Sequence, residues 1–381
     1  MKVCYIAHRT NLNGASRSLL DLLDGIDRTR FEPIVLVNSH GPFLNELKQR
    51  GIPYRFAPII PSLNSDDPLL DFIKRALNFP PLYHLFLSCI KLQMKRIGPD
   101  IVHNNTMLST IGMQAAKDLD IPYICHHREL LWEGFHRKLI REEKDHKLIR
   151  EASANISISE LVKNAFRPYA GKEINVIPDG IHIENYDLPL HDILSGKTVT
   201  LLLAGRIDRN KGQLDAVKAV EIAHKKSDKD LQLRIIGAVG DQTYADELRD
   251  YVSSHSLDYV SIEDFAKDLS ALRKDCDIGL TCSYTEGLGR VTIENMLSSL
   301  LVIASDSGGT LEIISDRENG LFYRTGSPED LAEKIEWAIH HPERSQQIAA
   351  QGHDETLRTF DCKAYASRIE AIYDSIQRER N

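Results

Sequence analysis

The sequence predicts an α/β protein of two Rossmann-like domains, with parallel sheets that face each other across a cleft. Two observations carry this prediction. Short apolar strands alternate with amphipathic helices along the chain, an order typical of parallel, doubly wound sheets. The alternation then restarts at the strongly apolar residues 198–204. A chain of 381 residues is long enough for two such domains.

The first domain is expected to comprise residues 1–187. A helix after its first strand is indicated by Leu19, Leu22 and Ile26, which recur at helical spacing. Its strands are expected at residues 3–7, 33–37, 101–103, 123–125, 154–158 and 174–177.

The second domain is expected to comprise residues 188–363. The polar stretch 187–197 contains Pro189 and Gly196, and we interpret it as the linker. Further strands are expected at residues 198–204, 231–236, 278–281 and 302–305.

Two helices are expected near the end of the chain. Ser327 followed by Pro328 is typical of a helix start, with a serine cap and a proline at the first helical position. A last helix is expected at about residues 363–378, and we expect residues 364–381 to cross back onto the first domain.

Composition restricts the partners and the compartment. The net charge of −8 argues against nucleic acid as the main partner. The six cysteines form no Cys-x-x-Cys pair, and those in apolar runs are expected to be buried thiols of a reducing compartment. A strand starts at Lys2, without a signal peptide, and no run of 18 apolar residues occurs. We therefore expect a cytoplasmic protein.

Residues 69–97 are apolar with interleaved cations, among them Lys74, Arg75 and Lys95. Two interpretations stay open. The segment is a peripheral contact with the inner face of an anionic membrane, or it forms two helices that face the core and carry a polar rim.

A pair of carboxylates, Glu286 and Glu294, flanks a turn formed by residues 287–289. If a helix starts near Arg290, Glu294 lies on its first or second turn. The backbone N–H groups at that helix start then suit a phosphate, while the carboxylates suit hydroxyls.

Two loops that follow first strands add cations and a glycine. Arg206 and Lys211 follow the strand at 198–204, where the guanidinium and the ammonium suit phosphate oxygens. Gly14 follows the strand at 3–7 and precedes a helix, so a ligand could approach the backbone there.

The strand at 123–125 is followed by His126, His127, Arg128 and Glu129. On an extended chain, His126 and Arg128 point to one side and His127 to the other. This density of polar groups at a strand end predicts a ligand contact.

Together these motifs resemble the retaining glycosyltransferases of the GT-B fold, glycosyltransferase family 4, over nearly the whole chain. The resemblance implies that Arg206 and Lys211 neutralise the diphosphate of a nucleotide-sugar donor, a UDP-sugar or a GDP-sugar. Glu294 would hold the ribose and Glu286 the sugar. The remaining donor contacts implied are Gly14, Gly205, Leu288, Gly289, Arg290 and Val291.

The same resemblance implies a catalyst that needs no metal and no cofactor. Its first domain would bind the acceptor, a hydroxyl of a glycan, a lipid-linked glycan or a small glycoside. Arg128 and Glu129 are expected to line the cleft, with His127 as the alternative. Departures from the family pattern are Asn13, where a second glycine is usual, and Asp179, where asparagine is commoner.

Three other functions compete with glycosyl transfer. A nucleotide-sugar epimerase or hydrolase can share the fold, but the glutamate spacing together with the cationic loop favours transfer. A non-catalytic nucleotide-sugar sensor would not need the two phosphate cations. A dinucleotide oxidoreductase is disfavoured because no Gly-x-Gly-x-x-Gly follows either first strand.

Overall fold

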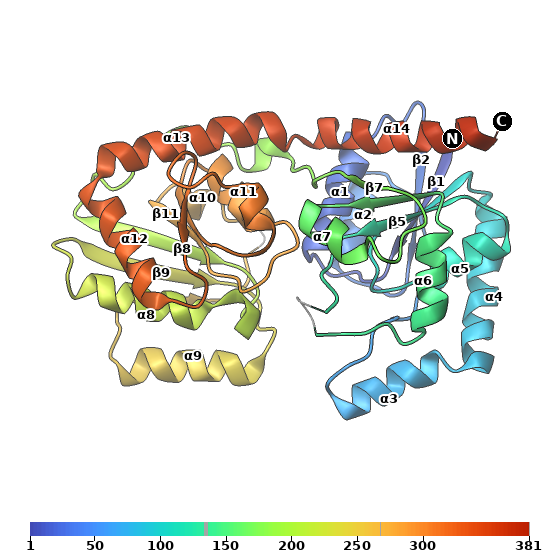
Figure 1. Ribbon diagram of the computed structural model, residues 1–381, viewed down its shortest axis with the longest axis horizontal. Coiled ribbons are helices and arrows are strands. Elements are labelled where there is room, and N and C mark those ends of the chain that lie inside the picture. The colour runs from blue at the N-terminus through green and yellow to red at the C-terminus, as the bar shows by residue number, and fades with distance from the viewer. Residues whose placement is uncertain (133–135, 267, 381) are drawn as a thin grey trace. The chain divides into compact units, whose positions relative to one another are not determined.

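The computed structural model describes residues 1–132, 136–266 and 268–380, and the chain divides into two compact units (Figure 1). The first unit is Met1–Ile181 together with Asp361–Asn381, and the second is His182–Phe360. The chain crosses between them a few residues earlier than the expected positions 187 and 363. Asn381, the end of the expected segment 364–381, lies outside the described residues.

The described part of the first unit holds a seven-stranded parallel sheet in the order β3-β2-β1-β4-β5-β6-β7. Its strands are β1 (Lys2–Ala7), β2 (Glu32–Val37), β3 (Tyr54–Phe56), β4 (Ile101–Asn104), β5 (Tyr123–His127), β6 (Ala154–Ser157) and β7 (Ile174–Val176). The six predicted strands are confirmed. The edge strand β3 was missed, because three partly exposed residues leave no apolar pattern to recognise.

Helices cover this sheet (Figure 1). They are α1 (Gly14–Gly25), α2 (Pro42–Gln49), α3 (Pro68–Leu77), α4 (Pro80–Ile97), α5 (Ile111–Asp118), α6 (Glu142–Arg150), α7 (Glu160–Phe166) and α14 (Cys362–Arg380). The last helix, α14, packs along α1 and places Tyr365, Ile369 and Tyr373 in the core that also contains Leu19 and Leu22.

The described part of the second unit holds a six-stranded parallel sheet in the order β10-β9-β8-β11-β12-β13. Its strands are β8 (Thr198–Ala204), β9 (Asp230–Ile236), β10 (Val260–Glu263), β11 (Ile278–Thr281), β12 (Leu301–Ser305) and β13 (Leu321–Tyr323). The four predicted strands are confirmed, and the two short edge strands were missed.

The helices of the second unit are α8 (Gln213–His224), α9 (Gln242–Ser254), α10 (Ser270–Arg273), α11 (Arg290–Leu297), α12 (Pro328–His340) and α13 (Pro342–Thr359). Short 3-10 turns are η1 (Ile183–Asn185), η2 (Arg209–Lys211) and η3 (Gly308–Glu312). The start of α12 is as predicted, since the Ser327 side chain accepts a hydrogen bond from the Asp330 amide and Pro328 is the first helical residue.

The interpretation of residues 187–197 as a linker was wrong, because this stretch packs into the second unit. Ile193 and Leu194 are buried in the core of that unit. The Leu194 amide donates to Asp277 Oδ1 at 2.6 Å, and the Ile193 amide donates to Gln346 Oε1 at 3.0 Å. The chain instead crosses at Ile181 and Asp361, which pair as an isolated parallel bridge.

Among the helices of the described ranges, none combines the length and the apolar character needed to cross a bilayer.

Candidate active site

Two loops of the second unit carry the predicted cations and Glu286. They meet between β8 and β11, where the order of strands along the sheet reverses. In the order β10-β9-β8-β11-β12-β13, the chain moves outward to one side from β8 and then restarts at β11 on the other side. Ligands of such sheets bind at this switch point, beyond the carboxyl ends of the strands. Residues 205–212 follow β8, and residues 282–289 follow β11.

Arg206 stands on the first of these loops with half of its side chain exposed. Its Nε donates to Asp208, and its carbonyl oxygen accepts a hydrogen bond from Gln213 Nε2 at 2.9 Å. A Cβ at Gly240 would lie 2.6 Å from Arg206 Cδ, so this glycine makes room for the arginine. The guanidinium is therefore positioned, yet it remains accessible to an anion.

Lys211 of η2 pairs with Glu286, so the two loops are joined through two predicted site residues. Ser283 Oγ donates to the same carboxylate oxygen at 2.9 Å. The next residue, Gly212, has φ +63°, and a Cβ there would lie 2.2 Å from the Cys282 carbonyl oxygen. Only glycine permits this approach of the β8 loop to the end of β11.

Two further glycines, Gly308 and Gly309, pack against the turn between the glutamates. A Cβ at Gly308 would lie 2.5 Å from the Glu286 amide nitrogen, and a Cβ at Gly309 would lie 2.6 Å from the Gly287 carbonyl oxygen. The Gly309 amide donates to the Glu286 carbonyl at 2.8 Å. Backbone contacts of η3 therefore hold the turn in place.

Helix α11 begins at Arg290, as predicted, with Gly289 at its N-cap and φ +96°. Gly289 makes no side-chain cap to the first turn, which includes Arg290 and Val291. Such an N-terminus favours an anion through its dipole and its N–H groups. Leu288, directly before the cap, is buried.

Glu294, on the second turn of α11, is buried between two arginines. Arg273 Nη2 donates to Glu294 Oε2 at 2.9 Å, and Arg290 Nε donates to Glu294 Oε1 at 3.0 Å. Arg273 also reaches Asn295 Oδ1 with Nε at 3.3 Å. Both carboxylate oxygens are thereby fixed in direction. Sequence reasoning missed Arg273, because no local pattern marks an arginine of α10 as the partner of a residue 21 positions later.

Arg128 follows β5 in the first unit, and its side chain forms an ion pair and hydrogen bonds within that unit. Its Nη1 donates to Asp179, its Nη2 donates to the Tyr365 hydroxyl at 3.0 Å, and its Nε donates to the Asn105 carbonyl at 2.9 Å. Asp179 in turn accepts from Ser18 Oγ at 2.7 Å. The expectation that Arg128 lines a cleft therefore finds no support; the residue joins β5, the loop after β4 and α14.

The two histidines are likewise internal. His126 Nδ1 lies 3.0 Å from His103 Nε2 and 3.3 Å from Arg128 Nη2. His127 points to the other side, as predicted, with Nε2 at 2.9 Å from Asn155 Oδ1 and its ring stacked on Phe166. Burial lowers the pKa of His127 to about 4, so it is neutral near pH 7. The geometry gives His127 a packing role rather than a ligand contact.

Glu129 differs from its neighbours because its carboxyl group titrates near neutrality. Burial raises its pKa to about 7, against the opposing charge of Arg128 and hydrogen bonds from Met107 and Thr106. The Met107 amide donates to Glu129 Oε2 at 3.3 Å. A group with such a pKa is suited to proton transfer.

Gly14 is the first residue of α1, and a Cβ there would meet nothing within 4 Å. The preceding residue, Asn13, caps the helix by accepting a hydrogen bond from the Ser16 amide at 3.0 Å. Space for a ligand therefore exists at Gly14, but one amide of the α1 N-terminus is already used.

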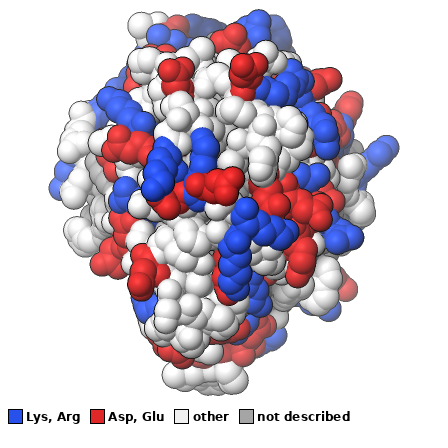
Figure 2. All heavy atoms as spheres, turned by 90° about the vertical axis from the view of Figure 1, so that its left-hand side faces the viewer, with Lys and Arg blue, Asp and Glu red and all other residues white. Residues whose placement is uncertain are grey.

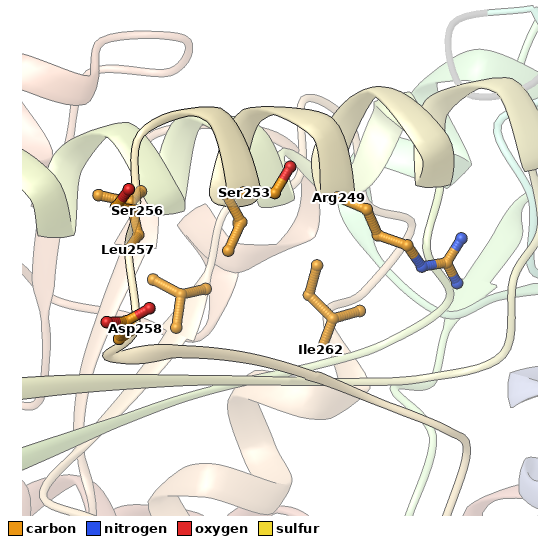
Figure 3. A pocket seen from close by; sticks show the side chains of 8 residues that line it. Arg249, Ser253, Ser256, Leu257, Asp258 and Ile262 are labelled. Carbon is orange, nitrogen blue, oxygen red and sulfur yellow. The ribbon is translucent and has the colours of Figure 1, made fainter.

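Other surface features of the second unit lie apart from these residues. Basic and acidic side chains alternate across the face in Figure 2. An open hollow of about 450 Å³ is bordered by α9 and β10, including Arg249, Ser253 and Ile262 (Figure 3). It contains none of the predicted site residues. Among the described residues, no group of three or more histidines, cysteines and acids is placed to hold a metal ion.

The fold is that of the GT-B glycosyltransferases. The solved structure of Anabaena Alr3699/HepE in complex with UDP and glucose matches with a TM-score of 0.80 and 22% identity. The match covers 98% of this chain and 100% of that one.

Two family models then match the chain in succession. "Glycosyltransferase Family 4" matches residues 12–185, and "Glycosyl transferases group 1" matches residues 193–355. The chain belongs to this family of glycosyltransferases, which confirms the resemblance drawn from the motifs.

Curated relatives match over shorter stretches. The uncharacterized glycosyltransferase MJ1178 of Methanocaldococcus jannaschii is 25% identical over 58% of this chain and 59% of its own length. The capsular polysaccharide biosynthesis glycosyltransferase CapM of Staphylococcus aureus is 23% identical over 53% of this chain and 54% of its own length. The chain thus spans about half the length of the curated relatives it matches.

Proposed function

We propose that the protein is a retaining glycosyltransferase that moves a sugar from a UDP-sugar, or alternatively a GDP-sugar, to a hydroxyl acceptor without a metal ion. The observation that carries this proposal is the meeting of the β8 and β11 loops. They bring Arg206, Lys211 and Glu286 to the sheet position where the N-terminus of α11 also begins. Family membership and a neighbour solved with UDP support a nucleotide-sugar donor.

The cations stabilise the leaving group. When the bond between the anomeric carbon and the diphosphate oxygen breaks, the electron pair stays on the diphosphate. Arg206, Lys211 and the first amides of α11 provide fixed positive charge for that oxygen, which lowers the barrier because the groups need no reorganisation. Many enzymes use a metal ion to stabilise a leaving diphosphate. Because the protein's own cations would do so here, we expect activity to persist in a chelator.

The glutamates place the donor. Glu294, fixed by its two arginines, accepts from the ribose hydroxyls. Glu286 exchanges its partner Lys211 for sugar hydroxyls when the diphosphate takes the ammonium. The acceptor oxygen attacks from the face that the diphosphate leaves, gives up its proton to the leaving diphosphate and forms the new bond with retained configuration.

The acceptor is proposed to be a growing or lipid-linked glycan, or a small glycoside. CapM, named for capsular polysaccharide biosynthesis, supports this class. On the first unit, Glu129 remains the candidate contact, since its pKa near 7 lets it accept or donate a proton. Arg128 and His127 are no longer proposed as contacts.

Donor binding is tested by thermal unfolding with a panel of UDP-sugars and GDP-sugars, with and without EDTA. A ligand at 100 times its dissociation constant adds about 2.7 kcal/mol of stability, which gives a clear shift. Failure of every nucleotide sugar to shift the transition would refute the proposal, and a shift abolished by EDTA would refute metal independence.

Turnover is tested with Lys211→Ala. The loss of one fixed charge should raise the barrier by about 2.7–4 kcal/mol, a decrease in kcat of about 10²–10³-fold. Lys197→Ala, at an exposed lysine of the same unit, is the matched control and should retain activity. Release of free sugar without transfer to any acceptor would favour the hydrolase instead.

A further inference from the structure

The sheet of the first unit has a switch point of its own, between β1 and β4. In the order β3-β2-β1-β4-β5-β6-β7, the chain moves outward from β1 to β3 and then restarts at β4 on the other side. Ile6 and Asn104 form the last residue pair of these two strands. Because ligands of open parallel sheets bind beyond the carboxyl ends of the strands at such a point, the next residues, His8 and Asn105, stand at a ligand position.

Buried polar atoms at this switch point have no hydrogen-bond partner in the part of the chain that the structure describes. They include His8 Nε2 and Asn105 Oδ1. Asn105 is 2% exposed, and its Nδ2 donates to the Ala15 carbonyl of α1 at 3.0 Å. The His8 side chain is at the border of the core, since the residue is partly exposed. A buried polar atom without a partner costs stability, so these two atoms indicate a site that a bound molecule completes.

The start of α1 adds open space and hydrogen-bond donors beside Asn105. A Cβ at Gly14 would meet nothing within 4 Å. The Asn13 side chain accepts from the Ser16 amide, whereas the amides of Gly14 and Ala15 donate to no other described residue. A group bound there can therefore accept hydrogen bonds from α1 while it donates one to Asn105 Oδ1.

The neighbours of His8 decide which of its ring nitrogens carries the proton. Burial lowers the pKa of His8 to about 3, so the ring is neutral near pH 7. Its Nδ1 lies 3.4 Å from Thr106 Oγ1, and the Thr106 side chain forms a hydrogen bond with Glu129. An ionised Glu129 can only accept, so Thr106 donates to it and in turn accepts from Nδ1–H. His8 Nε2 then presents a lone pair to the site.

The chemistry of the bound molecule follows from these groups. His8 Nε2 and Asn105 Oδ1 are both acceptors, so the molecule must donate to each of them. Hydroxyl groups donate one hydrogen bond and can also accept from the α1 amides, whereas an anion would face two lone pairs. Two hydroxyls of one sugar ring meet these requirements. The competing ligand is an anion that the α1 amides would hold together with Arg9, which is exposed next to His8.

We propose that His8 Nε2 and Asn105 Oδ1 accept hydrogen bonds from two hydroxyl groups of a neutral acceptor sugar at the start of α1. This inference rests on the proposed function and assigns its acceptor to the β1–β4 switch point. The two residues position the sugar and transfer no proton. They also determine specificity, because an acceptor that lacks one of the hydroxyls leaves a buried lone pair without a partner.

Histidine side-chain NMR on the whole chain tests the proposal. The protein carries ¹⁵N-histidine, the signals of His8 are assigned through His8→Phe, and the pH is 8.5, where a Glu129 with a pKa of about 7 is ionised. The probes are the methyl glycosides of glucose, galactose, mannose and N-acetylglucosamine, with and without UDP. Nε2 should be unprotonated, and at least one glycoside should shift its signal. Inorganic phosphate should not, and His84, exposed on α4, should respond to none of them.

Two variants separate this binding role from a structural one. His8→Phe should lower the affinity for the responding glycoside roughly tenfold, measured by saturation transfer to the ligand. Its thermal stability without ligand should be unchanged or higher, because a buried atom without a partner is removed. Thr106→Val keeps the shape but removes the hydroxyl that accepts from Nδ1. The proton of His8 should then move to Nε2, and the glycoside response should be lost. His84→Phe is the matched control and should bind the glycoside as the wild type does.

Four results would overturn the proposal. They are a protonated Nε2 in the wild type at pH 8.5, no response of His8 to any glycoside, a response to phosphate alone, and unchanged glycoside affinity in His8→Phe. The third would assign the start of α1 to an anion, and the fourth would leave only an internal water at His8. A thermal shift with nucleotide sugars but no glycoside response would refute this inference alone. A glycoside response without any nucleotide-sugar shift would refute the proposed function instead.

Discussion

Among the described residues, Arg273 is the largest side chain that is buried almost completely. Its guanidinium is tolerated there because Glu294 accepts from it at 2.9 Å. The prediction of Glu294 as a site residue came from its spacing to Glu286, but the group that fixes its charge and direction lies on another helix. A spacing in the sequence indicates a candidate ligand contact, but it does not indicate the residues that support it.

Arg273→Met should reduce stability strongly. Removal of one partner of a buried ion pair costs about 3–5 kcal/mol, and the loss here falls toward the lower end because Arg290 still pairs with Glu294. Denaturant unfolding measures this, with Arg249→Met on the exposed face of α9 as the control. A cost below about 1 kcal/mol for Arg273→Met would contradict the assigned role. Arg273→Lys should restore part of the loss, since it returns the charge but not the geometry.

Glu129 makes stability depend on pH. Its pKa rises from 4.5 in the unfolded chain to about 7 in the fold, because burial disfavours the charged form. The folded state therefore binds the proton more tightly, and this contribution is complete below pH 4.5 and is lost as pH rises toward 7.

Glu129→Gln removes this titration. The free energy of unfolding of the variant should gain on that of the wild type by up to about 3 kcal/mol between pH 4.5 and pH 7. Asp145, whose pKa burial also raises, to about 6, titrates in both proteins and cancels in the comparison. A difference that stays constant across this range would show that Glu129 does not titrate there.

At the scale of elements, glycines decide how closely the site loops approach each other. Gly212 carries a positive φ and faces the Cys282 carbonyl, whereas Gly14 has open space around it. Gly14 was singled out by its place after a first strand, and Gly212 lies in the corresponding loop after β8. The sequence cannot separate them, because the distinction depends on which strand lies beside the loop.

Gly212→Ala and Gly14→Ala form a matched pair of tests. The first should destabilise the second unit by about 1–3 kcal/mol through backbone strain and weaken donor binding, because the loop with Lys211 must move. The second should leave stability nearly unchanged. Thermal unfolding with and without donor measures both effects, and equal behaviour of the two variants would contradict the assigned constraint.

Elements were predictable where burial is continuous along the chain. All ten strands predicted from apolar runs are present, and nine of them lie inside the two sheets, where strands of parallel sheets are buried on both faces. The missed strands β3, β10 and β13 are three or four residues long and lie at or near sheet edges. The hydrogen bonds of the polar cluster after β5 were unpredictable for a different reason. Arg128 finds its partner Tyr365 on α14, more than 200 positions away, and no local pattern reveals such a tie.

At the scale of the whole molecule, the last helix completes the first unit. Tyr373 places its hydroxyl 2.7 Å from His103 Nδ1 and 3.1 Å from the Tyr5 hydroxyl, deep in a core that also holds Tyr365 and Ile369. Without α14, the apolar side chains of the first unit that pack against it would be exposed to solvent.

Truncation after Phe360 should therefore unfold the first unit selectively. Calorimetry of the truncated chain should retain the transition of the second unit, whose core lies within His182–Phe360, and lose the transition of the first. Retention of two cooperative transitions would contradict the role assigned to α14.

The bridge between Ile181 and Asp361 has a consequence for the order of folding. The second unit is an insertion in the first, and its two ends leave from adjacent positions. An unfolded insertion would be a long loop, whose closure costs conformational entropy before α14 gains any contact. Once the insertion has folded, its two ends are close together, and α14 starts directly beside the bridge between Ile181 and Asp361. The contiguous unit should thus form first during refolding, and the discontinuous one should form around ends that are already joined.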